Sequence, residues 1–153
     1  MNHVKNAAGQ VAAITTVLLL AACGGSDSIA GPTELTFAPE LGIDLSQMTQ
    51  TASGLYLLDV IVGDGAEAIL GSIVTVQFSG WLTNGVLFDS GLFPFTVGDP
   101  RVIPGFNEGT LGMKIGGQRK LVMPPNIAFG SAGGGIIPPN ATVVFEITLQ
   151  TIE

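Results

Sequence analysis

Hydrophobic and polar residues alternate along two long stretches of the chain. In residues 72–80, Val74, Val76 and Phe78 fall on one face, with polar residues between them, and residues 141–152 repeat the same pattern. A period of two residues is typical of a β-strand that buries one face and exposes the other. The pattern therefore predicts two half-buried strands.

Shorter elements are expected between these strands. Residues 54–62, 94–97 and 118–123 are rich in β-branched, aromatic and aliphatic side chains and end at glycine or proline, which predicts strands. Residues 106–114 follow Pro104, and proline is well suited to the first turn of a helix. Many strands with one short helix predict an α+β fold with an antiparallel sheet.

The hairpin predicted around Asn84-Gly85 carries unusual side chains. Asn-Gly is the pair most favoured in a two-residue type I′ turn, which needs positive φ at both positions. The strands on either side would bring Phe78, Phe88 and the carboxylate of Asp89 close together. An acid beside aromatic rings at a strand end predicts one wall of a binding pocket.

Phenylalanine is spread over the folded part of the chain. A sheet curled around one helix has a single concave face, where rings from different segments meet. Composition leaves two interpretations open, a phenylalanine-rich core and an aromatic-lined pocket with Asp89 at its edge. The six rings that lie on separate segments are Phe78, Phe88, Phe95, Phe106, Phe129 and Phe145.

Composition excludes several kinds of chemistry. The 153 residues suit one domain with a short appendage, and their net charge of −7 with only 5 Lys and Arg argues against nucleic acid as a partner. The single His is His3 and the single Cys is Cys23. A catalytic triad, a Cys–His pair and a His/Cys zinc site are therefore not expected in the folded body, and we predict no metal and no cofactor.

The N-terminus has the layout of a bacterial export signal. Residues 1–22 contain an early lysine, an apolar run and then small residues. Residues 20–24 read Leu-Ala-Ala-Cys-Gly and resemble the lipobox of bacterial lipoproteins, which implies a lipid on Cys23. An ordinary signal peptide is the alternative. The glycine after Cys23 favours a periplasmic protein anchored to the outer membrane.

Residues 23–51 are rich in Gly, Ser, Pro and Thr and show no sustained period, so we predict a flexible tether. Residues 41–48 could form one helical turn, too short for a helical dimerisation arm, and a monomer is expected. The folded domain is predicted to span residues 52–153.

Five fragments of this domain form an ordered set. They are Phe88-Asp89-Ser90, residues 102–109, Met113 with Gly117-Gln118-Arg119, Ala128-Phe129-Gly130 and residues 136–146. In this order and spacing they resemble the FKBP-type peptidyl-prolyl cis-trans isomerases. The resemblance implies a twisted, half-open antiparallel β-sheet wrapped around one short α-helix. It also implies proline-containing polypeptide substrates and macrolide inhibitors as partners.

The resemblance also implies the functional residues of an apolar cradle for a proline ring. Phe106 would be its floor, the backbone N–H of Ile103 would donate to a substrate carbonyl, and residues 129–139 would form the rim. The expected catalytic residues are Asp89, Phe106, Ile103 and Phe129. The expected substrate-binding residues are Phe78, Phe88, Phe95, Val102, Ile136, Ile137 and Phe145.

The chain departs from the family pattern at several of these positions. Phe78 and Phe129 stand where the family commonly has Tyr, and Phe106 stands where it commonly has Trp. The predicted loop at residues 90–94 is short and lacks the Arg that often accompanies the acid. These changes keep the apolar cradle but remove polar groups, which weakens the expectation of macrolide binding more than that of isomerisation.

Proline isomerisation suits a chain whose folded body lacks His and Cys, since rotation about the imide bond breaks no covalent bond. Two other functions remain: a chaperone that holds proline segments without turnover, and a purely structural envelope lipoprotein. Asp89 favours the isomerase, because non-catalytic relatives often lose the acid.

Overall fold

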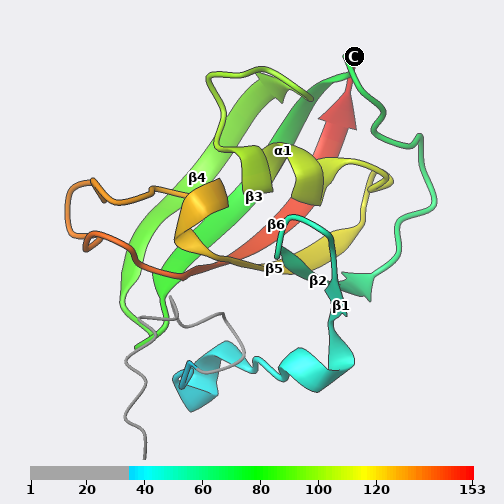
Figure 1. The fold of residues 1–153 in the computed structure, drawn as a ribbon. Helices are drawn as coiled ribbons and strands as arrows, with labels where there is room; N and C mark the ends of the chain where they lie inside the picture. Colours follow the sequence, from blue (N-terminus) through cyan, green and yellow to red (C-terminus); the bar gives the residue numbers. More distant parts are fainter. Residues whose placement is uncertain (1–34) are drawn as a thin grey trace, which may run out of the picture.

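The structure, a computed structural model, describes residues 35–153, in which six strands form one antiparallel sheet (Figure 1). The spatial order is β1-β2-β5-β6-β3-β4. This sheet and its short helix confirm the predicted α+β class. The strands are β1 (Thr49–Gln50), β2 (Tyr56–Ile61), β3 (Ile73–Leu82), β4 (Leu87–Thr96), β5 (Gln118–Met123) and β6 (Val143–Ile152).

One α-helix, α1 (Pro104–Thr110), packs across the sheet in the part of the chain that the structure describes (Figure 1). Pro104 lies in its first turn, as predicted. The helix ends before the predicted residue 114, because Leu111 is extended at ψ 132° and Gly112 has φ +76°. No helix in residues 35–153 is long and apolar enough to cross a membrane.

Two glycines and one arginine fix α1 against β5. Gly105 and Gly109 lie one helical turn apart, and a Cβ at either position would clash with a β5 side chain. The close approach therefore requires glycine. Arg119 of β5 is buried; its Nη1 donates to the carbonyls of Gly109 and Leu111 at 3.0 and 3.1 Å. Its Nε pairs with Asp59 at 2.6 Å.

The hairpin between β3 and β4 has a different turn from the predicted type I′. Among residues 35–153, Asn140 is the only non-glycine residue with positive φ, so Asn84 lacks the required conformation. Gly85 alone has it, at φ +87°. Its N–H donates to the carbonyl of Leu82 at a distance of 3.0 Å, and the N–H of Leu82 donates to the carbonyl of Val86 at 2.9 Å. This is the bonding of a three-residue loop with glycine in the left-handed position.

The predicted loop at residues 90–94 is a second difference from the structure, because these residues do not form a loop. They belong to β4, which pairs with β3 along its full length. Near the turn, Gly80 lies opposite Asp89 and Trp81 lies opposite Leu87, so Phe88 is an extra residue in β4. A bulge of this kind redirects side chains, and bulges are frequent beside active sites.

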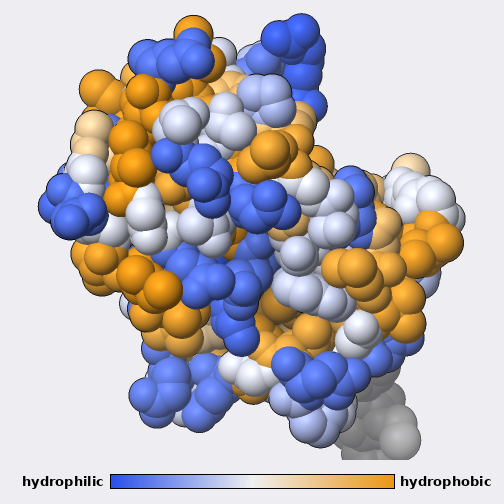
Figure 2. Space-filling view, turned by 180° about the vertical axis from the view of Figure 1, so that it is seen from behind, coloured by the Kyte–Doolittle hydropathy of each residue, from blue (hydrophilic) through white to orange (hydrophobic). Residues whose placement is uncertain are grey.

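The sheet has two apolar clusters, one on each side. The larger lies between the sheet and α1 and includes Phe106, Leu121 and Phe145. Seen from behind, the other face has a hydrophilic band across its middle (Figure 2). Paired polar residues of three strands contribute to this face: Gln77, Ser79, Gln118, Lys120, Glu146 and Thr148.

The second cluster shows that residues 35–51 do not behave as the predicted flexible tether. Two 3₁₀ turns, Pro39–Leu41 and Leu45–Gln47, lie in this segment. Leu41 is 5% exposed and packs in one cluster with Tyr56, Val122 and Val144. The folded part therefore begins before residue 52, because scattered apolar residues of the segment cover the outer face of the sheet. The predicted signal peptide and Cys23 lie outside the described residues.

Candidate functional site

A pocket of about 230 Å³ opens on the side of the sheet that carries α1. Eight of its ten lining residues are apolar and two are charged. A small apolar cavity with few polar groups is typical of a specific ligand site. The lining residues are Phe78, Phe88, Asp89, Phe93, Arg101, Val102, Ile103, Phe106, Phe129 and Phe145.

Phe106 forms the floor of this pocket. It is the third residue of α1 and is 4% exposed. Its ring meets Phe145 and Phe78 edge to face, with centroids 5.4 and 6.0 Å apart. Phe93 and Phe95 contact it from the β4 side, at 5.8 and 5.5 Å. These preferred aromatic geometries fix the floor and leave it without a polar group.

Phe88 forms the wall near the hairpin. Its ring lies 5.5 Å from Phe145 and 5.8 Å from Phe129, both edge to face. Gly80 makes room for this arrangement, because a Cβ there would lie 2.7 Å from both Phe88 Cζ and Phe145 Cε1. The bulge in β4 thus places Phe88 and Asp89 at the pocket together.

Ile103 supplies a polar group at the pocket. It is the residue before α1, and its carbonyl accepts from the N–H groups of Phe106 and Asn107 at 3.0 and 3.2 Å. Its own N–H has no hydrogen-bond acceptor within residues 35–153. Ile103 is half-buried, and a free backbone donor beside an apolar cavity can bind the carbonyl of a ligand.

Asp89 and Arg101 are the two charged lining residues. Asp89 is exposed and accepts from the N–H of Ser90 at 2.9 Å. No Lys or Arg of residues 35–153 lies within 4.0 Å of its carboxylate. Arg101 instead pairs with Asp99 at 2.6 Å. Hydrogen bonds from the side chain and backbone of Arg101 lower the pKa of Asp99 from 3.8 to about 2.

The structure brings eight of the eleven predicted cradle residues to the pocket and leaves three away from it. Phe95 is buried behind the floor, stacked on Phe93 with centroids 5.1 Å apart. Ile137 is 7% exposed and belongs to the core, whereas Ile136 is 60% exposed in the preceding loop. Neighbouring positions in this loop turn in opposite directions, so neither isoleucine lines the cavity.

Phe93 and Arg101 line the pocket but were not among the predicted site residues. Phe93 lay in the supposed loop at residues 90–94. Had β4 been recognised there, alternation with Phe95 would have placed both rings on one face. Arg101 stands two residues before Ile103, and only the turn that joins β4 to α1 brings it to the pocket.

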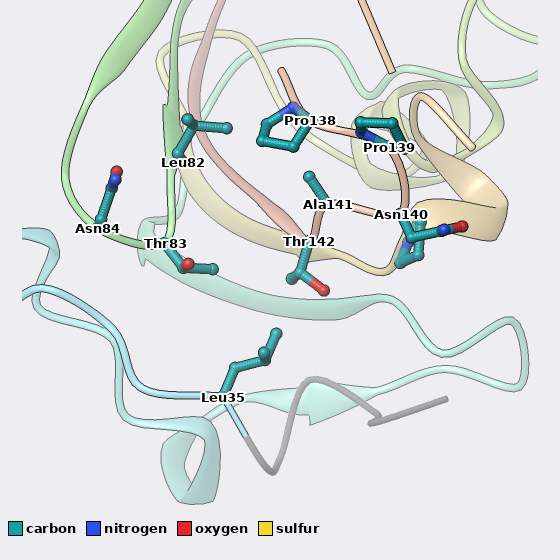
Figure 3. A pocket seen from close by; sticks show the side chains of 10 residues that line it. Leu35, Leu82, Thr83, Asn84, Pro138, Pro139, Asn140, Ala141 and Thr142 are labelled. Atoms are coloured by element: carbon teal, nitrogen blue, oxygen red, sulfur yellow. The ribbon is translucent and has the colours of Figure 1, made fainter. Parts of the chain in front are cut away.

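A larger cavity of about 610 Å³ lies beside the hairpin turn and is lined by no charged residue (Figure 3). Leu82 and Ala141 line it from two sides, with Pro138 and Pro139 close by and Leu35 opposite (Figure 3). It contains no aromatic ring and no carboxylate. Size alone therefore does not make it the better candidate site. No cluster of metal-binding side chains occurs among residues 35–153.

Comparison with known protein families covers the part of the chain that forms this pocket. Residues 65–150 match the family described as "FKBP-type peptidyl-prolyl cis-trans isomerase". The chain belongs to this family. An FK506-binding protein of Neisseria meningitidis serogroup B is 46% identical over 105 residues, which cover 65% of this chain and 96% of the relative.

Solved structures of the family share the fold. FkpA from Escherichia coli has 32% sequence identity and a TM-score of 0.66, covering 75% of this chain and 55% of that one. A peptidyl-prolyl cis-trans isomerase from Pseudomonas syringae pv. tomato has 29% identity and a TM-score of 0.63, covering 70% of this chain and 81% of its own. The half-open sheet wrapped around a short helix is the fold of this family, as predicted. Membership of the family supports peptidyl-prolyl isomerase activity, proline-containing substrates and binding of FK506-type macrolides.

Proposed function

We propose that this protein accelerates cis-trans isomerisation of X-Pro bonds in its aromatic pocket. The observation that carries the proposal is the apolar floor around Phe106 with the unpaired N–H of Ile103 beside it. A proline ring is small and apolar, and the imide next to it carries carbonyl groups that need donors. The pocket offers both surfaces to one ligand.

The reaction needs an environment more than a reactive group. The planar imide is stabilised by resonance, and rotation about it has a barrier of roughly 18–20 kcal/mol. Twisting the C–N bond removes the conjugation and with it part of the charge separation. An apolar pocket therefore disfavours the planar imide more than the twisted one, which is preferential binding of the transition state.

Asp89 and Ile103 would orient the peptide over the floor. The Ile103 N–H would donate a hydrogen bond to a substrate carbonyl. The exposed carboxylate of Asp89, at the edge of the pocket, would orient the bound imide through its charge. Phe129 would cover the bound ring from the loop that follows β5, next to Phe88. No proton transfer is required of any of these groups.

The proposal includes the place where the protein acts. The lipobox-like residues around Cys23 support export and a lipid anchor at the bacterial envelope, with the pocket in the periplasm and the outer membrane favoured. Substrates would then be exported polypeptides whose folding waits for slow X-Pro exchange, which takes tens to hundreds of seconds without a catalyst. We infer a monomer that needs no cofactor.

A short X-Pro peptide tests the proposal, because it gives a chaperone nothing to protect from aggregation. The full chain, well below the peptide concentration, should accelerate cis-trans exchange measured by exchange NMR. Asp89→Asn should lower kcat/KM about tenfold, equivalent to ~1.4 kcal/mol of transition-state stabilisation, while Asp64→Asn at an exposed position should not. Exchange at the uncatalysed rate, together with suppressed aggregation of an unfolded protein, would instead establish the holding chaperone.

A further inference from the structure

Arg101 is the one cation at a pocket whose other lining residues are eight apolar side chains and one acid. Its side chain is 88% exposed, whereas that of its partner Asp99 is 16% exposed. The charge is therefore displayed at the mouth of the pocket, where the polypeptide on either side of a bound proline must pass.

The turn that carries Arg101 holds its guanidinium in a defined place. Asp99 accepts from Arg101 Nε at 3.0 Å, from Nη2 at 2.6 Å and from the Arg101 backbone N–H at 2.9 Å. The carbonyl of Asp99 in turn accepts from the Asn107 amide of α1 at 2.8 Å. Asp99 thus anchors the arginine fork to the same helix that carries Phe106.

This anchoring leaves donors free. A guanidinium has five N–H groups in a planar fork, and Asp99 accepts from Nε and one hydrogen of Nη2. Both hydrogens of Nη1 have no partner in residues 35–153. One of them and the second hydrogen of Nη2 point in the same direction and form a fork that matches a carboxylate. Arginine binds a carboxylate better than lysine because this fork fits two oxygens.

We propose that Arg101 is a specificity residue that makes the pocket prefer prolines flanked by Asp or Glu. This inference rests on the proposed function and adds a substrate class to it. The net charge of −7 would by itself disfavour acidic peptides. Charges separated by more than about 8–10 Å are largely screened at physiological salt. Asp89 lines the same pocket and Asp99 already pairs with the guanidinium, so the preference requires direct contact between the flanking acid and the free N–H groups of Arg101.

The test compares X-Pro peptides that carry Glu, Gln or Lys at the positions next to the proline, each turned over by the full chain. We expect kcat/KM for the Glu peptide to exceed that for the Gln peptide by about two- to fivefold, the range of an exposed charge pair. The Lys peptide should be the poorest, and higher salt should reduce the differences.

Two variants show whether Arg101 causes the preference. Arg101→Gln should abolish the Glu-to-Gln ratio, and Arg101→Lys should keep part of it, since the charge stays but the fork is lost. Lys114→Gln removes a positive charge at another exposed position and should leave the ratio unchanged. A ratio that survives Arg101→Gln, or falls equally in Lys114→Gln, overturns the proposal.

Fluorescence anisotropy measures the affinities of the same peptides, which gives the Glu-to-Gln ratio independently of turnover. If the Glu, Gln and Lys peptides are all turned over at the same rate, the protein is an isomerase and the role proposed for Arg101 is wrong. If no peptide is turned over but the Glu peptide binds about two- to fivefold more tightly through Arg101, isomerisation fails and the specificity stands. Equal affinities for the Glu, Gln and Lys peptides overturn the inference in either case.

Discussion

The backbone N–H of Ala38 donates to the carbonyl of Thr83 over 2.8 Å. This bond ties the N-terminal segment to the turn of the hairpin whose strands carry Gly80, Phe88 and Asp89. Lys120 Nζ donates to the carbonyl of the neighbouring Leu41 at 2.7 Å. The segment at residues 35–51 thus braces the outer face of the sheet, opposite the face that carries the pocket.

Removing the apolar anchor of this segment should destabilise the domain. Leu41→Ala is expected to lower the free energy of unfolding by about 2–5 kcal/mol, since it empties a buried leucine site. Urea unfolding of the full chain measures this. Gln47→Ala, at an exposed position of the same segment, should change stability by less than about 0.5 kcal/mol. Equal effects of the two variants would show that the segment is not packed.

Gly80→Ala should damage the pocket more than the fold. The new methyl group would push against the rings of Phe88 and Phe145, which costs about 1–3 kcal/mol of stability through overpacking. Displacement of the wall should lower kcat/KM for a short X-Pro peptide about tenfold or more, because small misplacements at a site are costly. Ser79→Ala, the adjacent position on the opposite face, is the control. Full activity in a folded Gly80→Ala protein would mean that Phe88 is not part of the site.

Phe129→Tyr should restore a polar group that the family commonly has. Phe129 is half-buried at the pocket, and a hydroxyl added at the ring edge can bond a ligand carbonyl. One additional hydrogen bond is worth about 1 kcal/mol, so affinity for an FK506-type macrolide should rise roughly fivefold. Isothermal titration calorimetry of both proteins measures it. Affinity that stays constant or falls would show that this hydroxyl position does not reach the ligand.

The Asp99–Arg101 pair should respond to pH in acid only. Because the pKa of Asp99 is lowered from 3.8 to about 2 in the folded protein, the pair contributes stability above pH 3.8 that is lost as the pH falls towards 2. The difference in urea midpoint between wild type and Asp99→Asn should therefore be present at pH 6 and shrink towards pH 2. A difference that is the same at both pH values would contradict the pairing.

The sequence predicted those strands and helices whose type is determined by neighbouring residues. The strand Gln118–Met123 was found at its true bounds because it ends at Pro124-Pro125, which cannot continue a sheet ladder. Helix α1 was found from Pro104, although its end was placed too late. The two-residue period of a strand and the 3.6-residue period of a helix can be read from the order of residues alone.

Features that depend on contacts between distant segments were missed. Leu41 is buried only because β2, β5 and β6 present an apolar outer surface to it. Phe93 reaches the pocket because residues 90–93 continue β4 without a break up to Pro94, a residue that on its own suggests the start or end of a strand. The family resemblance placed most pocket residues, but it also placed Ile136 and Ile137, whose orientation depends on this particular loop.

The most direct test of the central claim is exchange of a short X-Pro peptide with the full chain, measured with and without an FK506-type macrolide. The account predicts acceleration over the uncatalysed rate and its loss when the macrolide saturates the pocket, with binding read independently from chemical shifts of Phe106 and Phe145. Exchange no faster than in the absence of protein would contradict the account, and so would undiminished turnover with the macrolide bound in the pocket.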